Sequence, residues 1–390
     1  MDFAFTEDQE IFRCVVRDFA ARELAPAYQQ HDRDKAFPER QLKACAQFGL
    51  LGLRVPEALG GNAQTYVTSG IAAEECGRAD FNVAYFPLMF NAIGELLARH
   101  ANAELQRTWL PKMTAGEAVV AVALTEPGVG SDAGSLSCKA QRDGDHYVLT
   151  GEKSSVSFCS RANMVIVFAR TQPGAGAKGI SGFCVPTTLP GVSRTVYSSM
   201  GSKCLGRGSL FLDGVRVPAH WRVGEEHRGF QMIMTIFDYS RAIIGLMCLG
   251  AAASGLERTC EYVKQRWAFG VPLAKFEGVS FPIAEHLTYV EAARLLCYKT
   301  LWLCDQNLSH TREAAMAKWW APKVAVDALH ECLLLHGHYG YSDEYPIEQQ
   351  LRDVIGLEIG DGTAQISKMI IGRDVFGREF RPYQRPGVGP

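Results

Sequence analysis

Residues 335–373 read LHGHYGYSDEYPIEQQLRDVIGLEIGDGTAQISKMIIGR, and the rest of the chain can be interpreted around them. Glycine turns interrupt the stretch twice, and the second turn lies at residues 360–362. Apolar residues recur at helical spacing after that turn, which predicts a helix that starts near Thr363. Asp361 therefore stands on a tight turn just before a helix N-terminus. The helix dipole favours an acid there whatever its function, so the turn alone does not identify a site.

Composition excludes several classes of protein. The chain has 390 residues, of which 47% are hydrophobic and 21% charged, as is ordinary for a folded soluble protein of more than one domain. The net charge of -2 predicts neither nucleic-acid binding nor attachment to an anionic membrane. The longest apolar stretch, 242–256, is too short to span a bilayer and predicts a buried helix.

The cysteines and the N-terminus indicate the cytoplasm. Twelve cysteines are scattered singly and none forms a Cys-x-x-Cys pair, which argues against a zinc ribbon or a disulfide scaffold and fits a reducing compartment. The first residues, MDFAFTEDQE, contain early acids and no basic-then-apolar run, so we expect no signal peptide. We therefore expect a cytoplasmic protein.

Three segments of different periodicity follow one another. Helical patterns fill residues 1–118, and a capping box starts the first helix at Thr6. Over 119–226, strand alternation and hairpin signals predict a β-barrel or β-sandwich domain. Long helical patterns return over 227–390 and predict a helical bundle. The chain is therefore predicted to be an α+β multidomain protein, without the strand–helix alternation of a Rossmann unit.

Two Asp-Gly pairs predict hairpin turns in the β segment. Asp143-Gly144 is expected to join strands at 139–142 and 146–149, and Asp213-Gly214 to join strands at 209–212 and 215–217. The apolar runs at 119–124, 165–169 and 182–186 predict further strands.

The first strand leads into a glycine-rich turn, Leu-Thr-Glu-Pro-Gly-Val-Gly-Ser-Asp at 124–132. No helix follows it, so phosphate capture at a helix N-terminus is unsupported, and Gly-x-Gly alone is a weak nucleotide signal. The turn instead offers backbone N–H groups and the hydroxyls of Thr125 and Ser131. Such groups can bond the polar edge of a planar heterocycle or an acyl carbonyl.

Two arginines in the predicted bundle are candidate functional residues. Arg241, in Phe-Asp-Tyr-Ser-Arg (237–241), immediately precedes a buried run, and because lone buried arginines are rare we expect a carboxylate partner. Arg266, in Gln-Arg-Trp-Ala-Phe-Gly (265–270), could neutralise a phosphate with its fork-shaped guanidinium. A structural salt bridge explains either arginine equally well.

Taken together, these motifs resemble the acyl-CoA dehydrogenase family over nearly the full length of the chain. Five elements occur in the family's order: the 124–132 turn, Gly-Glu-Lys at 151–153, Phe-Asp-x-x-Arg at 237–241, Gln-Arg-x-x-Phe-Gly at 265–270, and Glu-Tyr-Pro at 344–346 leading to Arg-Asp at 352–353 and Gly-Thr-x-x-Ile at 362–366. The resemblance implies an N-terminal helical domain, a middle β domain and a C-terminal four-helix bundle. It also implies FAD, an acyl-CoA substrate, an electron-transfer flavoprotein as acceptor and usually a homotetramer.

Positions that match the family's motifs are expected to form the site. The residues expected beside the flavin ring are Val122, Leu124, Thr125, Gly130, Ser131, Ser155, Val156 and Ser157. The residues expected to contact the FAD of a neighbouring subunit are Arg266, Phe269, Phe276, Glu277, Leu334, Gly337 and His338. Thr363 and Gln365 are expected at the adenosine half. The thioester is expected to contact Ser131, Asp238, Arg241 and Gly362.

The resemblance also implies a base. In the family's chemistry a base removes the α-proton of the thioester while the β-hydride passes to flavin N5. The usual base is a glutamate in a Tyr-Glu-Gly-Thr run, and here the run is Gly360-Asp361-Gly362-Thr363. The alternative base position holds Ser240, which cannot serve. Asp361 is therefore the expected base and Arg241 its expected charged neighbour.

The shorter base and the missing aromatic residue depart from the family's pattern. Asp lacks one methylene of Glu, and a misplacement of about 1 Å can slow a reaction ~10²-fold. Gly360 also removes a bulky wall of the pocket. A wider pocket beside a shorter base suits a branched or alicyclic acyl group, and we expect a relative of the cyclohexanecarboxyl-CoA dehydrogenases.

Further departures leave other functions open. Ser155-Val156-Ser157 replaces a tryptophan contact of the family and should alter solvent access and redox potential at the flavin. His336 and His338 could suggest metal ligands, but no further ligands accompany them in the sequence, so we expect no metal site. One alternative is a flavin oxidase of the nitroalkane-oxidase type, which also uses an Asp base and would be reoxidised rapidly by O₂. Another is a flavin-binding protein without turnover.

Overall fold

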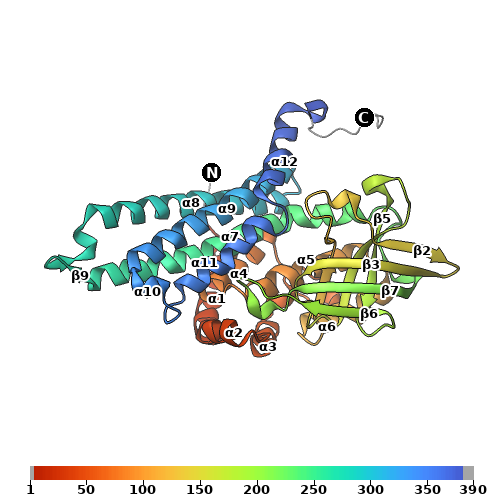
Figure 1. Cartoon of the computed structure of the whole chain (residues 1–390), viewed down its shortest axis with the longest axis horizontal. Helices are drawn as coiled ribbons and strands as arrows, with labels where there is room; N and C mark the ends of the chain where they lie inside the picture. Colours follow the sequence, from red (N-terminus) through yellow and green to blue (C-terminus); the bar gives the residue numbers. More distant parts are fainter. Residues whose placement is uncertain (1–3, 381–390) are drawn as a thin grey trace.

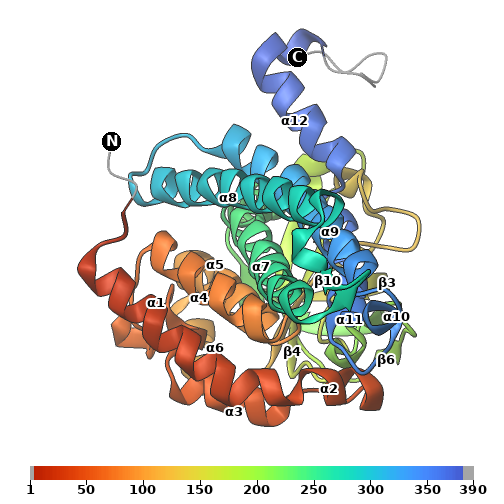
Figure 2. The same cartoon turned by 90° about the vertical axis from the view of Figure 1, so that its left-hand side faces the viewer.

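The computed structural model describes residues 4–380. The predicted order of helices, a β domain and a helical bundle is confirmed (Figure 1). In Figure 1 the sheet lies on the right together with α5 and α6, most of the other helices lie to the left, and α12 projects away from the rest, as Figure 2 also shows.

The N-terminal part is helical. Its first helix starts with the predicted capping box: Thr6 Oγ1 accepts a hydrogen bond from the backbone N–H of Gln9, and the Gln9 side chain accepts one from the backbone N–H of Thr6. The helices of this part are α1 (Glu7–Phe19), α2 (Tyr28–Asp34), α3 (Glu39–Gln47), α4 (Tyr66–Ala79), α5 (Tyr85–His100) and α6 (Ala103–Thr114).

The middle part is one curled sheet with strand order β6-β7-β3-β2-β4-β5-β8, and β1 pairs in parallel with β4. Its strands are β1 (Val120–Ala123), β2 (Lys139–Asp143), β3 (His146–Val156), β4 (Met164–Arg170), β5 (Ile180–Pro186), β6 (Val192–Val196), β7 (Gly208–Pro218) and β8 (Arg222–Val223). Alternate residues such as Tyr147, Val165, Phe183 and Val215 point into a core of its own.

The predicted hairpin at Asp213-Gly214 is wrong, because β7 runs straight through it. In the pairing of β3 with β7, Leu149 faces Val215 and Gly151 faces Leu212, so two residues of β7 oppose one of β3. This is a β-bulge, and Gly214 with φ 62° supplies the left-handed conformation that it needs. The Asp-Gly pair therefore bends a strand instead of ending it. The hairpin at Asp143-Gly144 is confirmed.

The C-terminal part is a helical bundle in which α7 packs against α8, α9 and α11. Its helices are α7 (Gly229–Gln265), α8 (Glu277–Asp305), α9 (Thr311–His336), α10 (His338–Tyr341), α11 (Ile347–Ile359) and α12 (Ala364–Phe376). A short hairpin of β9 (Trp267–Ala268) and β10 (Val271–Pro272) joins α7 to α8. Helix α11 was not predicted as a separate helix.

Helix α7 lies at the centre of the molecule. Of the described helices it is the one that is long and apolar enough to cross a membrane by length and composition, yet most of its apolar window is buried inside the protein. The predicted buried helix over 242–256 is thus confirmed. It also contacts α4 backbone to backbone: a Cβ added at Gly250 would lie 2.2 Å from the Glu74 carbonyl oxygen. This crossing joins the N-terminal helices to the bundle in one continuous core.

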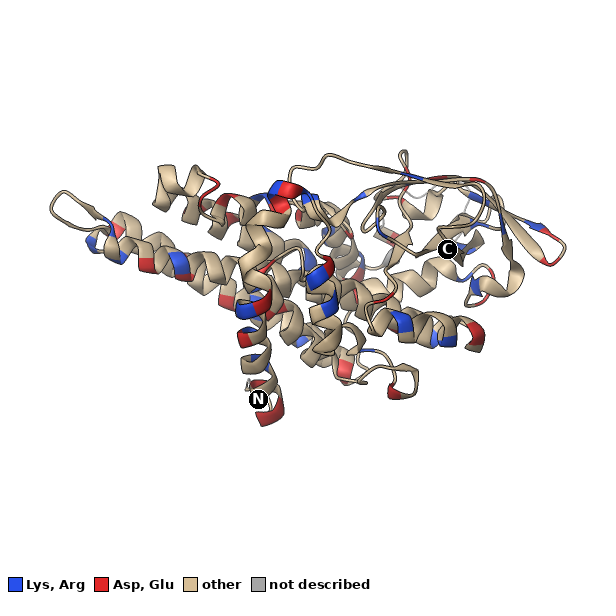
Figure 3. Ribbon diagram, turned by 90° about the horizontal axis from the view of Figure 1, so that it is seen from below, with Lys and Arg blue, Asp and Glu red and all other residues tan. Residues whose placement is uncertain are grey.

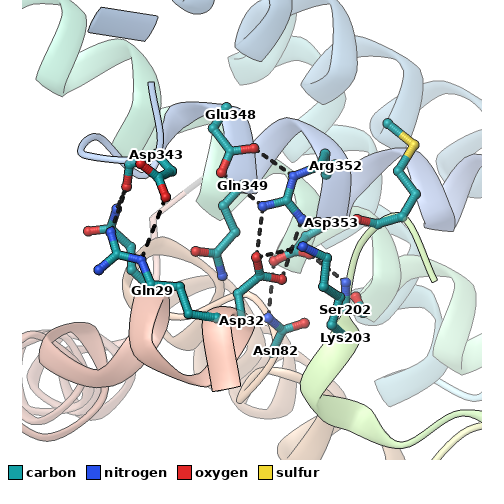
Figure 4. A network of polar contacts seen from close by, with 12 residues as sticks. Gln29, Asp32, Asn82, Ser202, Lys203, Asp343, Glu348, Gln349, Arg352 and Asp353 are labelled. Atoms are coloured by element: carbon teal, nitrogen blue, oxygen red, sulfur yellow. Dashed lines mark hydrogen bonds and ion pairs between the residues drawn. The ribbon is translucent and has the colours of Figure 1, made fainter. Parts of the chain in front are cut away.

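A polar network joins all three parts of the chain (Figure 4). Asp353 on α11 is 1% exposed, and its carboxylate accepts hydrogen bonds from Tyr28, Asn82 and the backbone N–H of Ser202. Burial raises the pKa of Asp353 to about 7. The network fixes the position of α11, the helix that leads into the turn of Asp361.

Charged residues are interspersed over the molecule. Figure 3 shows Lys and Arg next to Asp and Glu along the helices and the sheet, with neither sign gathered on one side of this view. This mixture agrees with a net charge of only -2.

Candidate active site

Asp361 lies in the turn between α11 and α12, as predicted. Its φ of 56° is left-handed, a conformation that Asp tolerates better than most residues, and Gly362 follows with φ 102°. Thr363 then caps α12, because its hydroxyl accepts a hydrogen bond from the backbone N–H of Ile366 at 3.4 Å. Asp361 is half-buried. Within residues 4–380 its carboxylate has no hydrogen bond and no ion pair, so it is free to accept a proton from a ligand.

The surroundings of Asp361 set its proton affinity. Burial raises the pKa of Asp361, and the positive charges of Lys318, Arg241 and Arg207 act against that rise, with Lys318 the strongest of the three. The pKa remains above the ordinary value of an aspartate. The predicted neighbour Arg241 is therefore part of the environment, but Lys318 and Arg207 were not predicted.

One signal in the sequence could have revealed Lys318. It stands among Ala314, Ala317 and Ala321 on the small-residue face of α9, where a lysine breaks the apolar pattern. Its side chain is fully buried. Arg207 lies just before β7 and follows no comparable pattern.

Tyr85, the first residue of α5, belongs to the same environment. It is 4% exposed, and its hydroxyl has no hydrogen-bond partner among the described residues. Burial raises the pKa of Tyr85 to about 12, and the nearby charges include Arg207 and Asp361. Tyr85 was not predicted as a site residue.

Arg241 is buried and paired with a carboxylate, as predicted. Its Nη1 donates to Asp238 Oδ1 at 2.7 Å, one turn earlier on α7. The other carboxylate oxygen of Asp238 accepts from Thr311 Oγ1 at 2.6 Å. Arg241 Nε is buried without a partner among the described residues, so this donor is available to a ligand.

The glycine-rich turn after β1 is held by a buried ion pair. Lys153 Nζ lies 2.8 Å from Glu126 Oε1 and donates to the carbonyl of Leu124 at 3.0 Å. The Glu126 carboxylate also accepts the backbone N–H groups of Ser137 and Cys138. Burial raises the pKa of Glu126, but these hydrogen bonds and Lys153 outweigh it, so the pKa lies below the ordinary value.

This turn presents an open surface on the edge of the sheet. Gly130, Ser131 and Ser155 are exposed, and Val122, Thr125 and Ser157 are partly exposed. A Cβ added at Gly130 would meet no atom of the chain within 4 Å. The residues predicted beside a flavin ring are thus open to a ligand. Leu124 and Val156 are 8% and 1% exposed, so they can offer it chiefly their backbone.

A second group of predicted cofactor residues gathers far from this turn. Figure 1 places β9, between α7 and α8, at the opposite end of the molecule from the sheet. Phe269, next to β9, is 96% exposed. The other members of this group lie at the same junction of α7, α8, α9 and α10, and they are Arg266, Phe276, Glu277, Leu334, Gly337 and His338. Within one chain the structure does not bring this group to the 124–131 turn.

Thr363 and Gln365 begin α12 beside Asp361, and Gln365 is exposed. His336 has a structural environment: it is 2% exposed, its Nδ1 lies 2.9 Å from the Cys332 carbonyl oxygen, and its ring stacks on Tyr262. Across residues 4–380 there is no cluster of three His, Cys, Asp or Glu side chains that could hold a metal ion.

Comparisons with known proteins agree with this architecture. The chain matches the family descriptions "Acyl-CoA dehydrogenase, N-terminal domain" over residues 6–117, "middle domain" over 121–215 and "C-terminal domain" over 227–376. It is 34% identical to the probable acyl-CoA dehydrogenase YngJ of Bacillus subtilis over 96% of this chain and 100% of that protein. It is 32% identical to the caffeyl-CoA reductase-Etf complex subunit CarC of Acetobacterium woodii, over 94% of this chain and 98% of that one.

The fold is shared with solved structures of the same kind. Butyryl-CoA dehydrogenase from Megasphaera elsdenii superposes with a TM-score of 0.92 at 30% identity, over 96% of this chain and 100% of that one. All three family regions, the full-length relatives and the fold point the same way. The chain belongs to the acyl-CoA dehydrogenase family, whose members are FAD-dependent oxidoreductases that act on CH–CH bonds.

Proposed function

We propose that this protein dehydrogenates the α,β bond of a branched or alicyclic acyl-CoA thioester, with Asp361 as the base. The observation that carries the proposal is the carboxylate of Asp361: it is half-buried, it has no hydrogen bond or ion pair within residues 4–380, and the positive charges of Lys318, Arg241 and Arg207 lower its pKa against the rise caused by burial. Groups in such settings are typical of acid–base catalysis.

The FAD is proposed to lie on the 124–131 turn, with Thr125, Ser131, Ser155 and Ser157 as its polar contacts. The open surface at Gly130 and the ion pair beneath the turn support this placement, because a ligand needs both space and a fixed backbone. When bound, FAD supplies the acceptor for the hydride that leaves the β-carbon.

The chain's own part in the reaction is the removal of a proton. Asp361 in its ionised form accepts the α-proton, and the C–H electron pair becomes part of the new double bond. Burial raises the pKa of Asp361 and so strengthens it as a base, while Lys318, Arg241 and Arg207 keep its charged form accessible. The free Arg241 Nε and the Asp238–Arg241 pair are proposed to line the thioester's path.

The preference for a branched or alicyclic acyl group is supported by the turn itself. Gly360 carries no side chain, and a Cβ there would make ordinary van der Waals contacts at 3.4 and 3.5 Å, so the chain does not itself require a glycine at this position. The short Asp361 side chain then leaves additional width beside the reacting carbons. A cyclohexanecarboxyl group fits such a pocket better than a thin linear chain.

A homotetramer and an electron-transfer flavoprotein complete the proposal. The exposed group around Arg266 and Phe269 lies too far along the chain's long axis to serve its own 124–131 turn, so a second copy must bring it to an FAD (Figure 1). CarC, a relative of this chain, is named as a subunit of a complex with Etf. The twelve free cysteines support our proposal of a cytoplasmic location.

The proposal is tested by anaerobic mixing of the FAD-loaded protein with linear, branched and cyclohexanecarboxyl thioesters of CoA. We expect the flavin absorbance to bleach fastest with the cyclic or branched thioester. Faster bleaching by a linear thioester would overturn the substrate class. Bleaching by a nitroalkane and indifference to CoA thioesters would indicate the oxidase, and no bleaching by any compound would indicate a protein without turnover.

A further inference from the structure

Lys318 on α9 is a buried lysine whose hydrogen-bond partners are two carbonyl groups. Its Nζ donates to the carbonyl oxygen of Leu357 at 2.7 Å and to that of Gly362 at 3.0 Å. The side chain is fully buried, and within residues 4–380 no carboxylate forms an ion pair with it at 4.0 Å or less. A buried ammonium group without a paired carboxylate is costly, so the position calls for an explanation.

The two carbonyls lie on either side of Asp361. Leu357 is in the last turn of α11, where the final carbonyls of a helix lack partners inside the helix. A cation at this end also interacts favourably with the helix dipole. Gly362 immediately precedes Thr363, the residue that caps α12. Lys318 therefore ties the end of α11 to the entrance of α12 across the turn that contains Asp361.

The backbone conformation of the turn requires stabilising contacts. Asp361 adopts φ 56°, a conformation that costs energy for a residue with a Cβ and persists only where the surroundings hold it. Its carboxylate forms no hydrogen bond or ion pair with the described residues. The two hydrogen bonds from Lys318 join both sides of the turn, in addition to the backbone hydrogen bond from Gly360 to Gly356 and the Thr363 cap.

We infer that Lys318 is a positioning residue for Asp361: it fixes the turn that presents the carboxylate and places a positive charge beside it. The first part concerns the structure of the turn alone. The second part rests on the proposed function, in which Asp361 accepts the α-proton.

The charges around Asp361 agree with this inference. Lys318 from α9, Arg241 from α7 and Arg207 before β7 all lower the pKa of Asp361 against the rise caused by burial, and Lys318 has the largest effect of the three. The charge of Asp361 in turn contributes to the raised pKa of Tyr85 on α5. Burial lowers the pKa of Lys318, whereas Asp361, Cys248 and Glu358 raise it and Arg241 lowers it.

The first test uses three substitutions at Lys318. Lys318→Met removes both hydrogen bonds and the charge, Lys318→Gln keeps a donor without the charge, and Lys318→Arg keeps both. Lys323→Met is the matched control, because Lys323 lies on the same helix, is exposed and pairs with Asp327 at 2.6 Å. If Lys318→Met does not fold, the comparison of Lys318→Gln with Lys318→Arg carries the test.

In FAD-loaded protein we expect Lys318→Met to slow flavin reduction ~10²-fold, as a displaced base would. The effect should appear in kcat more than in KM. For Lys318→Met and Lys318→Gln, the pH profile should move to higher pH, because loss of a positive charge raises the pKa of a nearby carboxyl. Lys318→Arg should restore most of the rate. Wild-type rates and an unchanged profile in folded Lys318→Met or Lys318→Gln would overturn the inference.

A second measurement separates this inference from the proposed function. Amide hydrogen exchange over residues 360–367 should be faster in Lys318→Met or Lys318→Gln than in Lys323→Met, whether or not Asp361 is the base. Equal exchange rates in the Lys318 variants and in Lys323→Met would overturn the inference that Lys318 fixes the turn. Full activity of Asp361→Asn would instead overturn the base assignment. If Lys318 positions Asp361 and Asp361 is the base, adding Lys318→Met to the Asp361→Asn variant should not slow flavin reduction any further. Equal slowing by Lys318→Met in the wild type and in the Asp361→Asn variant would show that Lys318 does not act through Asp361.

Discussion

At the scale of single residues, the site depends on one carboxylate held in an unusual environment. Asp361 is half-buried and adopts a left-handed conformation in its turn. Its carboxylate forms no hydrogen bond or ion pair with the described residues, and three positive charges lower its pKa. Burial strengthens it as a base, and the charges limit that effect. The two influences together determine the pH at which the residue can accept a proton.

This balance predicts the pH dependence of flavin reduction. Because the pKa of Asp361 lies above the ordinary aspartate value, the rate should rise with pH through that raised pKa and then level off. Stopped-flow reduction with a saturating thioester, measured across the acid and neutral range, gives the profile. A rate that is flat through this range would mean that the titrating base is another group.

Substitution of Arg241 should change the same profile. In Arg241→Ala the pKa of Asp361 should rise further, since one of the charges that lower it is gone, and the profile should shift to higher pH. Reduction below that pKa should become slower. Arg216→Ala is the control, because Arg216 pairs with Asp143 on the exposed side of the sheet. An identical shift in both variants would exclude a specific link between Arg241 and Asp361.

Asp361 was predicted at its turn and Arg241 was expected to pair with a carboxylate, because each residue belongs to a short motif, whereas Asp238 was predicted only as a contact of the thioester and not as the partner of Arg241. Lys318 was not predicted, because its two hydrogen-bond partners are backbone carbonyls that lie 39 and 44 residues further along the chain. These two carbonyl groups come within hydrogen-bonding distance of Lys318 only after α9, α11 and the turn have packed together, so the sequence alone does not reveal the contact. Arg207 and Tyr85 were not predicted because their electrostatic interactions with Asp361 likewise depend on the packing of elements that are far apart in the sequence.

At the scale of elements, the buried pair of Lys153 on β3 and Glu126 on the glycine-rich turn is the main support of the cofactor surface. Lys153→Met should leave a buried carboxylate without its cation and lower the free energy of unfolding by about 3–5 kcal/mol. The exposed Lys139→Met on β2 should change it little. FAD should also dissociate faster from Lys153→Met. Urea unfolding and flavin release measure both effects, and equal behaviour of the two variants would contradict this role.

The pH dependence of this pair has a defined sign. The pKa of Glu126 is lowered in the folded state, so its stabilising contribution is present above the unfolded pKa and is lost as the pH falls through the folded pKa. The difference in stability between wild type and Lys153→Met should therefore shrink in acid.

Elements with strong periodicity were predicted and weaker ones were not. The long helices α7, α8 and α9 and the buried strands β4 and β5 appear where apolar spacing indicated them. Strand β6 was missed because it is mostly exposed and pairs with the sheet only through β7. The bulge in β7 was read as a hairpin turn, since Asp-Gly favours the left-handed conformation that both structures need.

At the scale of the whole molecule, the network of Arg352 and Asp353 holds the three parts together (Figure 4). Arg352 binds Asp32 at 2.8 Å and Glu348 at 2.6 Å and donates to the Met200 carbonyl. The partners of Asp353 lie 151 to 325 residues away in the chain. The sequence analysis identified the Arg-Asp motif, but no local pattern could have revealed such distant partners.

This network predicts a coupling between the domains. Arg352→Met should lower the free energy of unfolding by about 2–3 kcal/mol, less than for a fully buried pair because Arg352 is partly exposed. The N-terminal helices should then unfold before the rest in calorimetry. Arg216→Met, which breaks an exposed pair, should cost about 0–1 kcal/mol and leave a single transition. Equal losses of unfolding free energy in Arg352→Met and Arg216→Met would show that the network does not hold the domains together.

One measurement tests most directly whether Asp361 is the base of this protein. FAD-loaded Asp361→Asn and wild-type protein are mixed anaerobically with the thioester that bleaches the wild type fastest. Asp374→Asn, at an exposed position of α12, is the control. Asp361→Asn should retain FAD but be reduced ~10²–10⁴-fold more slowly, because the proton acceptor is gone. Reduction of Asp361→Asn at the wild-type rate would contradict this expectation and assign the base to another residue.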